Sequence, residues 1–166
     1  DEFAAGSDLA LRLAARTRHA RSAAVQRLSQ TSRLDLTHTQ RIGLFGGTFD
    51  PPHNAHVALA HAALSALKLD LLLWIPAGQP WQKSRQIGDA AHREAMVRLA
   101  MGDEPRFVLD RTELERSGPS YTLDTVRALQ ARQPNAQLLL IIGADQYAGL
   151  HTWQNWQELL GRVMLA

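Results

Sequence analysis

The sequence contains no cysteine, which excludes both a disulfide framework and a thiolate metal site. Neither basic nor acidic residues are in large excess: 18 basic and 16 acidic residues leave a formal net charge of +2, which is too small to argue for nucleic-acid binding. The longest apolar runs, Leu69 to Ala77 and Leu138 to Ala144, are far short of the ~20 residues that span a bilayer. We therefore expect a cytoplasmic protein with neither a nucleic-acid nor a membrane partner, and homo-oligomerisation stays open.

The chain of 166 residues suits one domain, and 45% hydrophobic residues are enough for a core. Residues 1–40 differ from the rest, because six arginines lie there and no acid occurs between Asp8 and Asp35. Their composition is similar to that of a transit peptide. The first residue is not methionine, so a cloning remnant, a processed end and a dispensable extension all stay open. We expect a basic extension over 1–40 outside the fold, and one α/β domain over 41–166.

From Arg41 onward, short apolar segments alternate with segments of helical pattern. The segments expected to be strands are 42–45, 69–76, 107–109, 137–142 and 162–165. The segments expected to be helices are 56–67, 89–102, 122–133 and 153–160. Strands that are apolar throughout and alternate with helices predict a parallel sheet with helices on both faces. Ligands of such sheets bind beyond the carboxyl ends of the strands.

The segment GGTFDPPHNAH, residues 46–56, lies where the first expected strand ends. Its two glycines let the backbone approach a ligand closely, although neither GxGxxG nor GxxxxGK is present. The prolines indicate a turn, which places His53 in the first turn of the next helix and His56 on the same side of it. Free N–H groups at a helix start attract phosphate, and histidines there can donate hydrogen bonds to its oxygens. A polyphosphate site is predicted; simple helix capping stays open, and so does a zinc site, for which no third ligand is evident.

Two further segments lie at a helix start or a strand end. Gly143-Ala144-Asp145 follows an apolar strand, where a glycine and an acid can bind a sugar, or form an ordinary turn with a capping aspartate. Ser120-Tyr121-Thr122 precedes a helix, whose N–H groups can receive an anion; capping by Ser120 or Thr122 is the alternative.

Aromatic and basic side chains are less informative. Trp153 and Trp156 are three apart on an expected helix, a spacing more typical of a core than of a ligand contact. Lys83 lies in a loop after a strand, where a lysine is usually solvated. Four other basic residues are interpreted as helix-face or loop charge without an assigned role: Arg93, Arg98, Arg111 and Arg116.

Residues 46–56 resemble the GGxFDPxHxGH fingerprint of the nucleotidyltransferases that share an HxGH element. More narrowly, WIPAGQPWQK at 74–83, SYTLDT at 120–125 and Gly143-Ala144-Asp145 followed by Trp153 are similar to bacterial nicotinate-nucleotide adenylyltransferases. The family usually has glycine where this chain has Ala55; the turn survives that change if φ there is negative. The family's second phosphate motif, ISSTxxR, is not reached before Ala166. We therefore expect a Rossmann-like doubly wound sheet that is incomplete at the C-terminus.

The resemblance implies transfer of AMP from ATP to nicotinate mononucleotide, giving nicotinate adenine dinucleotide and pyrophosphate in NAD biosynthesis. Mg²⁺ would accompany ATP, without a metal site built by the protein. The expected catalytic residues are His56 and His53. The expected ATP-binding residues are Gly46, Gly47, Thr48, Phe49, His53, His56, Gly143 and Asp145. The expected mononucleotide-binding residues are Lys83, Tyr121, Thr122 and Trp153.

Two alternatives to this function stay open. The chain could be another adenylyl- or cytidylyltransferase with a different acceptor, such as phosphopantetheine. It could also be a nucleotide-binding module without catalysis, since the second phosphate motif is absent from these 166 residues.

Overall fold

The computed structural model describes residues 39–79 and 87–166, which belong to one compact unit, Thr39–Ala166. Almost all of the predicted extension, 1–40, lies outside the described residues, so its boundary with the α/β domain stays a prediction. Within the described residues, no helix is both long and apolar enough to cross a membrane.

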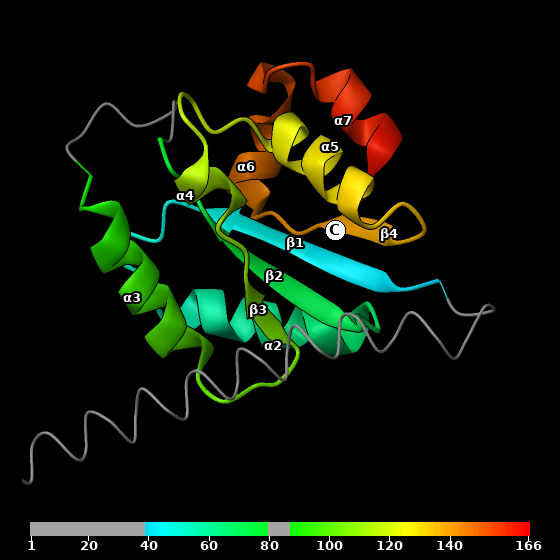
Figure 1. Ribbon diagram of the computed structural model, residues 1–166. Coiled ribbons are helices and arrows are strands. Elements are labelled where there is room, and N and C mark those ends of the chain that lie inside the picture. The colour runs from blue at the N-terminus through cyan, green and yellow to red at the C-terminus, as the bar shows by residue number, and fades with distance from the viewer. Residues whose placement is uncertain (1–38, 80–86) are drawn as a thin grey trace, which may run out of the picture. The chain divides into compact units, whose positions relative to one another are not determined.

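The centre of the domain is a parallel sheet in the order β3-β2-β1-β4-β5 (Figure 1). The strands are β1 Arg41–Gly47, β2 Leu71–Pro76, β3 Phe107–Leu109, β4 Gln137–Leu140 and β5 Met164–Leu165. Every neighbouring pair is parallel, as the uniformly apolar segments predicted. After β3 the chain returns to the other side of β1, so the strand order reverses between β1 and β4. Open sheets of this kind bind ligands at such a reversal, beyond the carboxyl ends of the strands.

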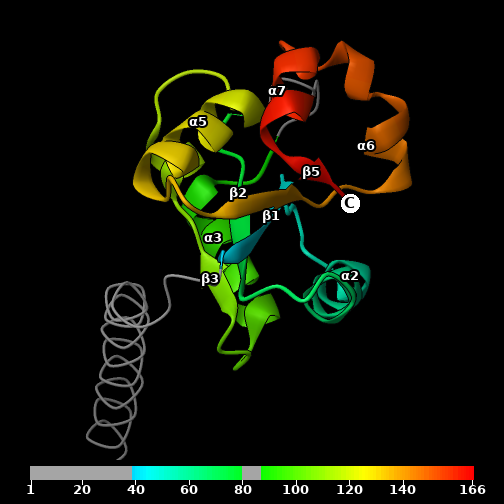
Figure 2. The ribbon, with the colours of Figure 1, turned by 90° about the vertical axis from the view of Figure 1, so that its right-hand side faces the viewer.

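Helices cover both faces of the sheet, and Figures 1 and 2 show α2 and α3 on one side and α5 and α7 on the other. The larger helices are α2 Asn54–Ala66, α3 Ala90–Met101, α5 Thr122–Arg132 and α7 Trp156–Arg162. Alternate side chains of β2 belong to different cores: Leu72 and Trp74 pack with residues of α2 and α3, while Leu73 and Ile75 pack with residues of α5 and α7. This is the period of a strand buried on both faces, and it confirms the predicted doubly wound α/β fold.

Short elements depart from the sequence-based expectation. The helices α4 Thr112–Glu115 and α6 Ala144–Ala148 and the 3₁₀ turn η2 Leu150–Thr152 were not predicted. The prediction that Trp153 and Trp156 share one helix is wrong. Trp153 follows η2, and Asn155 then adopts a left-handed conformation, with φ 51° and ψ 43°, so α7 begins only at Trp156. One residue at positive φ is enough to interrupt the expected helix, and no proline or glycine in this segment indicates the break.

Candidate active site

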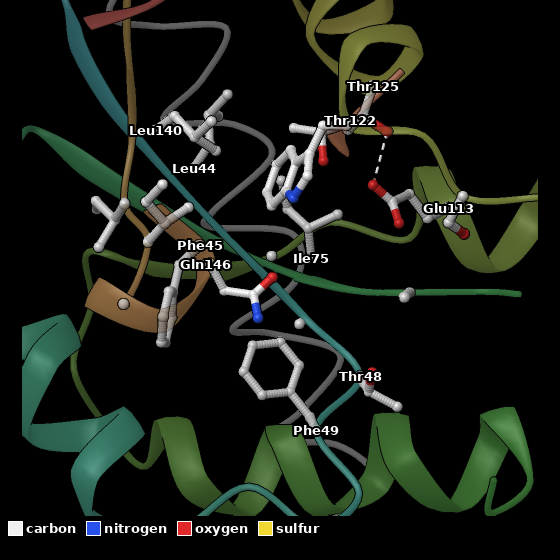
Figure 3. A pocket seen from close by; sticks show the side chains of 18 of the residues that line it. Leu44, Phe45, Thr48, Phe49, Ile75, Glu113, Thr122, Thr125, Leu140 and Gln146 are labelled. Carbon is white, nitrogen blue, oxygen red and sulfur yellow. Dashed lines mark hydrogen bonds between the residues drawn. The ribbon is translucent and has the colours of Figure 1, made fainter. Parts of the chain in front are cut away.

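A cavity of about 520 Å³ opens at the carboxyl ends of β1, β2 and β4. It brings together all the predicted site residues that the structure describes: Gly46, Gly47, Thr48, Phe49, His53, His56, Tyr121, Thr122, Gly143, Asp145 and Trp153. Lys83 lies outside the described residues. In the view of Figure 3, Phe45, Phe49 and Gln146 lie on one side of the cavity, and Glu113, Thr122 and Thr125 lie on the other. Residues predicted for the two substrates therefore line one space.

The loop after β1 forms the first wall. Phe49 has a left-handed backbone with φ 49°, and its side chain is only 3% exposed because the ring packs on Phe45 and Trp74. A Cβ on Gly47 would lie 3.0 Å from the Phe49 ring, closer than ordinary contact. The ring thus lies directly over Gly47, a close approach that only glycine allows without a shift. Thr48, between them, lines the cavity.

The two histidines contact each other at the start of α2. His53 is the N-cap, with an extended backbone, and so lies just before the helix rather than in its first turn. Its backbone N–H donates to Nδ1 of His56 at 3.1 Å, and the two ring centroids are 3.8 Å apart. The capping alternative is thus partly realised, through Nδ1 of His56. Because that nitrogen accepts, a neutral His56 ring carries its proton on Nε2, which remains a donor for a ligand.

The surroundings of His56 favour its neutral form. Partial burial, and in second place the neighbouring His53, lower the pKa of His56 below its ordinary value. Its ring is also 5.2 Å, centroid to centroid, from that of Phe49. A bound polyphosphate would act in the opposite direction, since nearby negative charge favours imidazolium. The hydrogen bond from the His53 N–H also favours the neutral ring, because protonating Nδ1 would remove its acceptor.

Ala55, where the resembling family usually has glycine, is the second residue of α2 and is exposed. Its φ is not positive, unlike that of Phe49, Lys68 and Asn155. The condition set for tolerating alanine here is met.

The wall beyond β4 is formed by the start of α6. Gly143 is its N-cap, and Asp145 follows in the first turn rather than at the cap. A Cβ on Gly143 would lie 2.7 Å from Oδ1 of Asp145, so the carboxylate folds back over the glycine. Gln146 donates to the same carboxylate at 3.1 Å and also lines the cavity. This arrangement presents a carboxylate beside an open backbone, which suits the hydroxyls of a sugar.

Tyr121 is the N-cap of α5, and its side chain makes no capping hydrogen bond. Capping by Ser120, one of the alternatives, is wrong: its hydroxyl oxygen accepts from the backbone N–H groups of Gly78 and Gln79, at 3.0 and 3.2 Å. Thr122 is the first residue of the helix and lines the cavity. In this first turn the N–H of Asp124 donates to the Tyr121 carbonyl at 3.1 Å, whereas the N–H groups of Thr122 and Leu123 precede the first helical hydrogen bonds. The predicted anion site at α5 therefore stays open at these two N–H groups.

Glu113 and Thr125 line the cavity, but sequence reasoning missed them. The Thr125 hydroxyl donates to a Glu113 carboxylate oxygen at 2.7 Å, and Arg116 donates to Thr125 at 3.2 Å. Burial raises the pKa of Glu113, although hydrogen bonds from Thr125 and Ser120 oppose that shift. Glu113 stands in the polar stretch RTELERSG, where no apolar period indicates that a side chain is buried.

The interpretation of Arg93 as simple helix-face or loop charge is wrong, because the residue is buried. Its side chain is 2% exposed, and its guanidinium donates to the carbonyls of Gly88, Thr48, Ala77 and Gly78. The physical reason is that α3 turns this residue toward the two loops that follow β1 and β2. By contrast, Arg98 and Arg111 are exposed and pair with Glu94, as surface charge would. Arg116 contacts Thr125 and so is part of the cavity wall's hydrogen-bond network.

Within the described ranges, no three histidine or carboxylate side chains are grouped so that they could hold a metal ion. The zinc alternative therefore gains no third ligand for the histidine pair from residues 39–79 and 87–166.

The family model described as cytidylyltransferase-like matches residues 44–166. The probable nicotinate-nucleotide adenylyltransferase of Methylibium petroleiphilum is 56% identical over 133 residues, which cover 80% of this chain and 63% of that protein. The protein of the same name in Albidiferax ferrireducens is 52% identical over 121 residues, 73% of this chain and 61% of that protein. The chain thus spans somewhat less than two thirds of these relatives.

Among solved structures, a putative nicotinate-nucleotide adenylyltransferase from Vibrio parahaemolyticus has a TM-score of 0.64 and 21% identity, covering 77% of this chain and 76% of that one. The nicotinic acid mononucleotide adenylyltransferase of Plasmodium falciparum, solved with NaAD, also has a TM-score of 0.64, with 18% identity, and covers 72% of this chain and 60% of that one. At such identities the likeness concerns the fold, which is that of the doubly wound sheet described above. The match over residues 44–166 shows that the chain belongs to the cytidylyltransferase-like family, and its likeness to the bacterial nicotinate-nucleotide adenylyltransferases confirms the resemblance found in the sequence.

Proposed function

We propose that this protein transfers the adenylyl group of ATP to nicotinate mononucleotide, forming nicotinate adenine dinucleotide and pyrophosphate in cytoplasmic NAD biosynthesis. The observation that carries the proposal is that one cavity is lined both by the loop after β1 with the histidine pair and by the start of α5 with Trp153. Relatives 56% and 52% identical to this chain have names that specify this acceptor, which supports the same choice here.

The reaction is an in-line displacement. A phosphate oxygen of the mononucleotide attacks the α-phosphorus of ATP, a new P–O bond forms, and the bond to the β-phosphate oxygen breaks with its electron pair leaving on pyrophosphate. No protein nucleophile is needed, so catalysis consists of positioning and charge stabilisation. Holding two reactants in the correct geometry can supply ~7–11 kcal/mol of the barrier.

The residues of this chain have distinct parts in that scheme. The backbone of Gly46 and Gly47, together with Thr48 and His53, orients the triphosphate, and Phe49 supports this loop from below. The Nε2 proton of His56 stabilises the charge that develops on the transferred phosphate. On the other side of the cavity, Gly143 and Asp145 receive the adenosine end of ATP.

The acceptor lies against the start of α5, where Tyr121 and Thr122 present the first-turn N–H groups to the nicotinate carboxylate. Trp153 stacks on the pyridine ring. Lys83 contacts the mononucleotide from the loop after β2.

Magnesium would be held mostly by phosphate oxygens and water, because the described residues offer no group of three carboxylates or histidines for it. Bound in that way, it would neutralise part of the triphosphate charge. The donor groups of the protein, at the loop after β1 and at His56, act on the remaining oxygens.

The test is a pyrophosphate-release assay with ATP and, one at a time, nicotinate mononucleotide, its amide form and phosphopantetheine. We expect release with nicotinate mononucleotide and less with the amide. Release only with phosphopantetheine would show that phosphopantetheine, and not nicotinate mononucleotide, is the acceptor. ATP binding in calorimetry without release from any acceptor would establish the non-catalytic alternative.

A further inference from the structure

One buried arginine connects the two loops that carry the proposed substrate sites. Arg93 extends from α3 behind the cavity without lining it. One of its terminal nitrogens donates both to the Thr48 carbonyl, at 3.0 Å, and to the Ala77 carbonyl, at 2.7 Å. Thr48 belongs to the loop after β1 and Ala77 to the loop after β2, and both line the cavity. The guanidinium therefore fixes these loops to one point.

The two remaining contacts of Arg93 extend the same connection. Its Nε donates to the Gly88 carbonyl at 3.0 Å, and its other terminal nitrogen donates to the Gly78 carbonyl at 3.3 Å. The backbone N–H of Gly88 in turn donates to Asp50 at 3.2 Å, so the loop after β1 is held from a second side.

The loop after β2 is itself held on both edges. Its carbonyls at Ala77 and Gly78 accept from Arg93, while its N–H groups at Gly78 and Gln79 donate to Ser120. The backbone N–H of Ser120 also donates to the Gln79 carbonyl at 3.0 Å. A continuous series of hydrogen bonds thus runs from Thr48, through Arg93 and residues 77–79, to Ser120, directly before the start of α5.

Only an arginine can make this set of contacts. Its guanidinium carries five N–H donors in a rigid planar fork, whereas a lysine ammonium is a single point with three. Burial lowers the pKa of Arg93, which Asp50 and Asp89 oppose. Burying a charge costs free energy unless its hydrogen bonds are satisfied, so a buried cation at this place needs the four carbonyls around it.

We propose that Arg93 is a positioning residue that sets the distance between the loop after β1, which orients the triphosphate, and the loop after β2, on the acceptor side of the cavity. The inference rests on the proposed adenylyl transfer. A misplacement of ~1 Å between two reactants can cost ~10²-fold in rate. Loss of Arg93 should therefore lower kcat strongly, while the affinity of each substrate for its own loop changes little.

The experiment compares Arg93→Lys and Arg93→Ala with Arg98→Lys and Arg98→Ala. Arg98 lies on the same helix, is exposed and pairs with Glu94, so it controls for losing an arginine from α3. Calorimetric titration with ATP gives the number of sites per chain and hence the folded fraction, and steady-state assays give kcat and both KM values. Guanidinium chloride, far below denaturing concentrations, is added to each alanine variant to replace the missing group.

For Arg93→Lys we expect one ATP site per chain, kcat lower by ~10²-fold and KM values within about threefold of the parent. Guanidinium should restore a substantial part of kcat in Arg93→Ala and nothing in Arg98→Ala. The proposal is overturned if kcat of Arg93→Lys stays within about threefold of the parent, or if both Arg93 variants lose ATP sites in proportion to kcat, which would indicate a folding role. A parent chain without pyrophosphate release would instead refute the proposed function, before any variant is compared.

Discussion

The hydroxyl of Thr125 donates a 2.7 Å hydrogen bond to the carboxylate of Glu113 in the wall of the cavity (Figure 3). The two residues are only 2% and 8% exposed. Burial penalises the charged carboxylate more than the hydrogen bonds favour it, so the pKa of Glu113 is raised. This pair therefore links the stability of the cavity wall to pH.

We expect Glu113→Gln to remove a pH-dependent destabilisation. Folded Glu113 keeps its proton to higher pH than unfolded Glu113, so the folded state binds more protons in the window between the two pKa values. The free energy of unfolding of the parent should fall, relative to the variant, as pH rises from about 4 through that window. Denaturant unfolding at a series of pH values measures this difference. Glu115→Gln, on the same short helix with a side chain 62% exposed, gives the baseline for removing a carboxylate. A parent that gains stability over Glu113→Gln as pH rises would contradict the assignment.

Gly78 is in contact with the backbone of α4. A Cβ on Gly78 would lie 2.1 Å from the Glu113 carbonyl oxygen, which is main chain and cannot rotate away. Gly78→Ala should therefore destabilise the domain by ~1–3 kcal/mol, the usual cost of overpacking, and should lower turnover because residues 77–79 shift. Thermal unfolding and the pyrophosphate assay measure the two effects.

Gly161→Ala is the matched control for Gly78. Gly161 lies within α7, and a Cβ there would meet nothing within 4 Å. Alanine in an open helical position should stabilise by ~0.5–1 kcal/mol. Equal effects of the two substitutions would show that the contact at Gly78 does not decide the outcome.

The strands and the longer helices were predictable because their patterns are local. β3 was expected over 107–109 and lies at Phe107–Leu109, and α3 was expected over 89–102 and lies at Ala90–Met101, with Asp89 as its N-cap. The apolar runs of β2 and β4 predicted strands of a sheet buried on both faces, and both segments are strands of that sheet. The sequence did not predict the backbone conformation of single residues. Asn155 is left-handed, and α7 therefore begins three residues later than expected.

The cavity residues divide in the same way. His53, His56 and Gly47 were found because they belong to a contiguous segment with a recognisable pattern. Arg93 and Glu113 were missed because their importance comes from burial against loops distant in the sequence, such as Thr48, which is 45 residues from Arg93. Charged residues in polar segments carry no local sign of such burial, and most of them are indeed exposed.

The proposed role of His56 predicts a lower turnover without a comparable loss of ATP affinity. His56→Ala removes the Nε2 donor, and turnover should fall by ~10²–10³, the scale of losing one preorganised donor. ATP affinity, measured by calorimetry, should change much less, because the backbone of the loop after β1 remains. His61→Ala, on the same helix but outside the cavity lining, should keep the parent's turnover. Turnover of His56→Ala within about threefold of the parent would leave His56 with its capping contact alone.

Trp153 lies in the cavity lining and also packs against the core that contains α5 and α7, so stacking and support must be separated by experiment. If the ring stacks on the pyridine of nicotinate mononucleotide, Trp153→Ala should weaken binding of that substrate by ~1–3 kcal/mol and leave ATP binding unchanged. Trp153→Phe should recover much of the loss, since a smaller aromatic face remains.

Trp156 provides the control, because it is half-buried like Trp153 but does not line the cavity. Trp156→Ala should change mononucleotide binding little. Melting temperature decides between the two parts of Trp153: a stacking residue lowers affinity in a domain that still melts near the parent's temperature. A large drop in melting temperature for Trp153→Ala, with ATP and mononucleotide weakened together, would make the indole a core residue and refute the stacking contact.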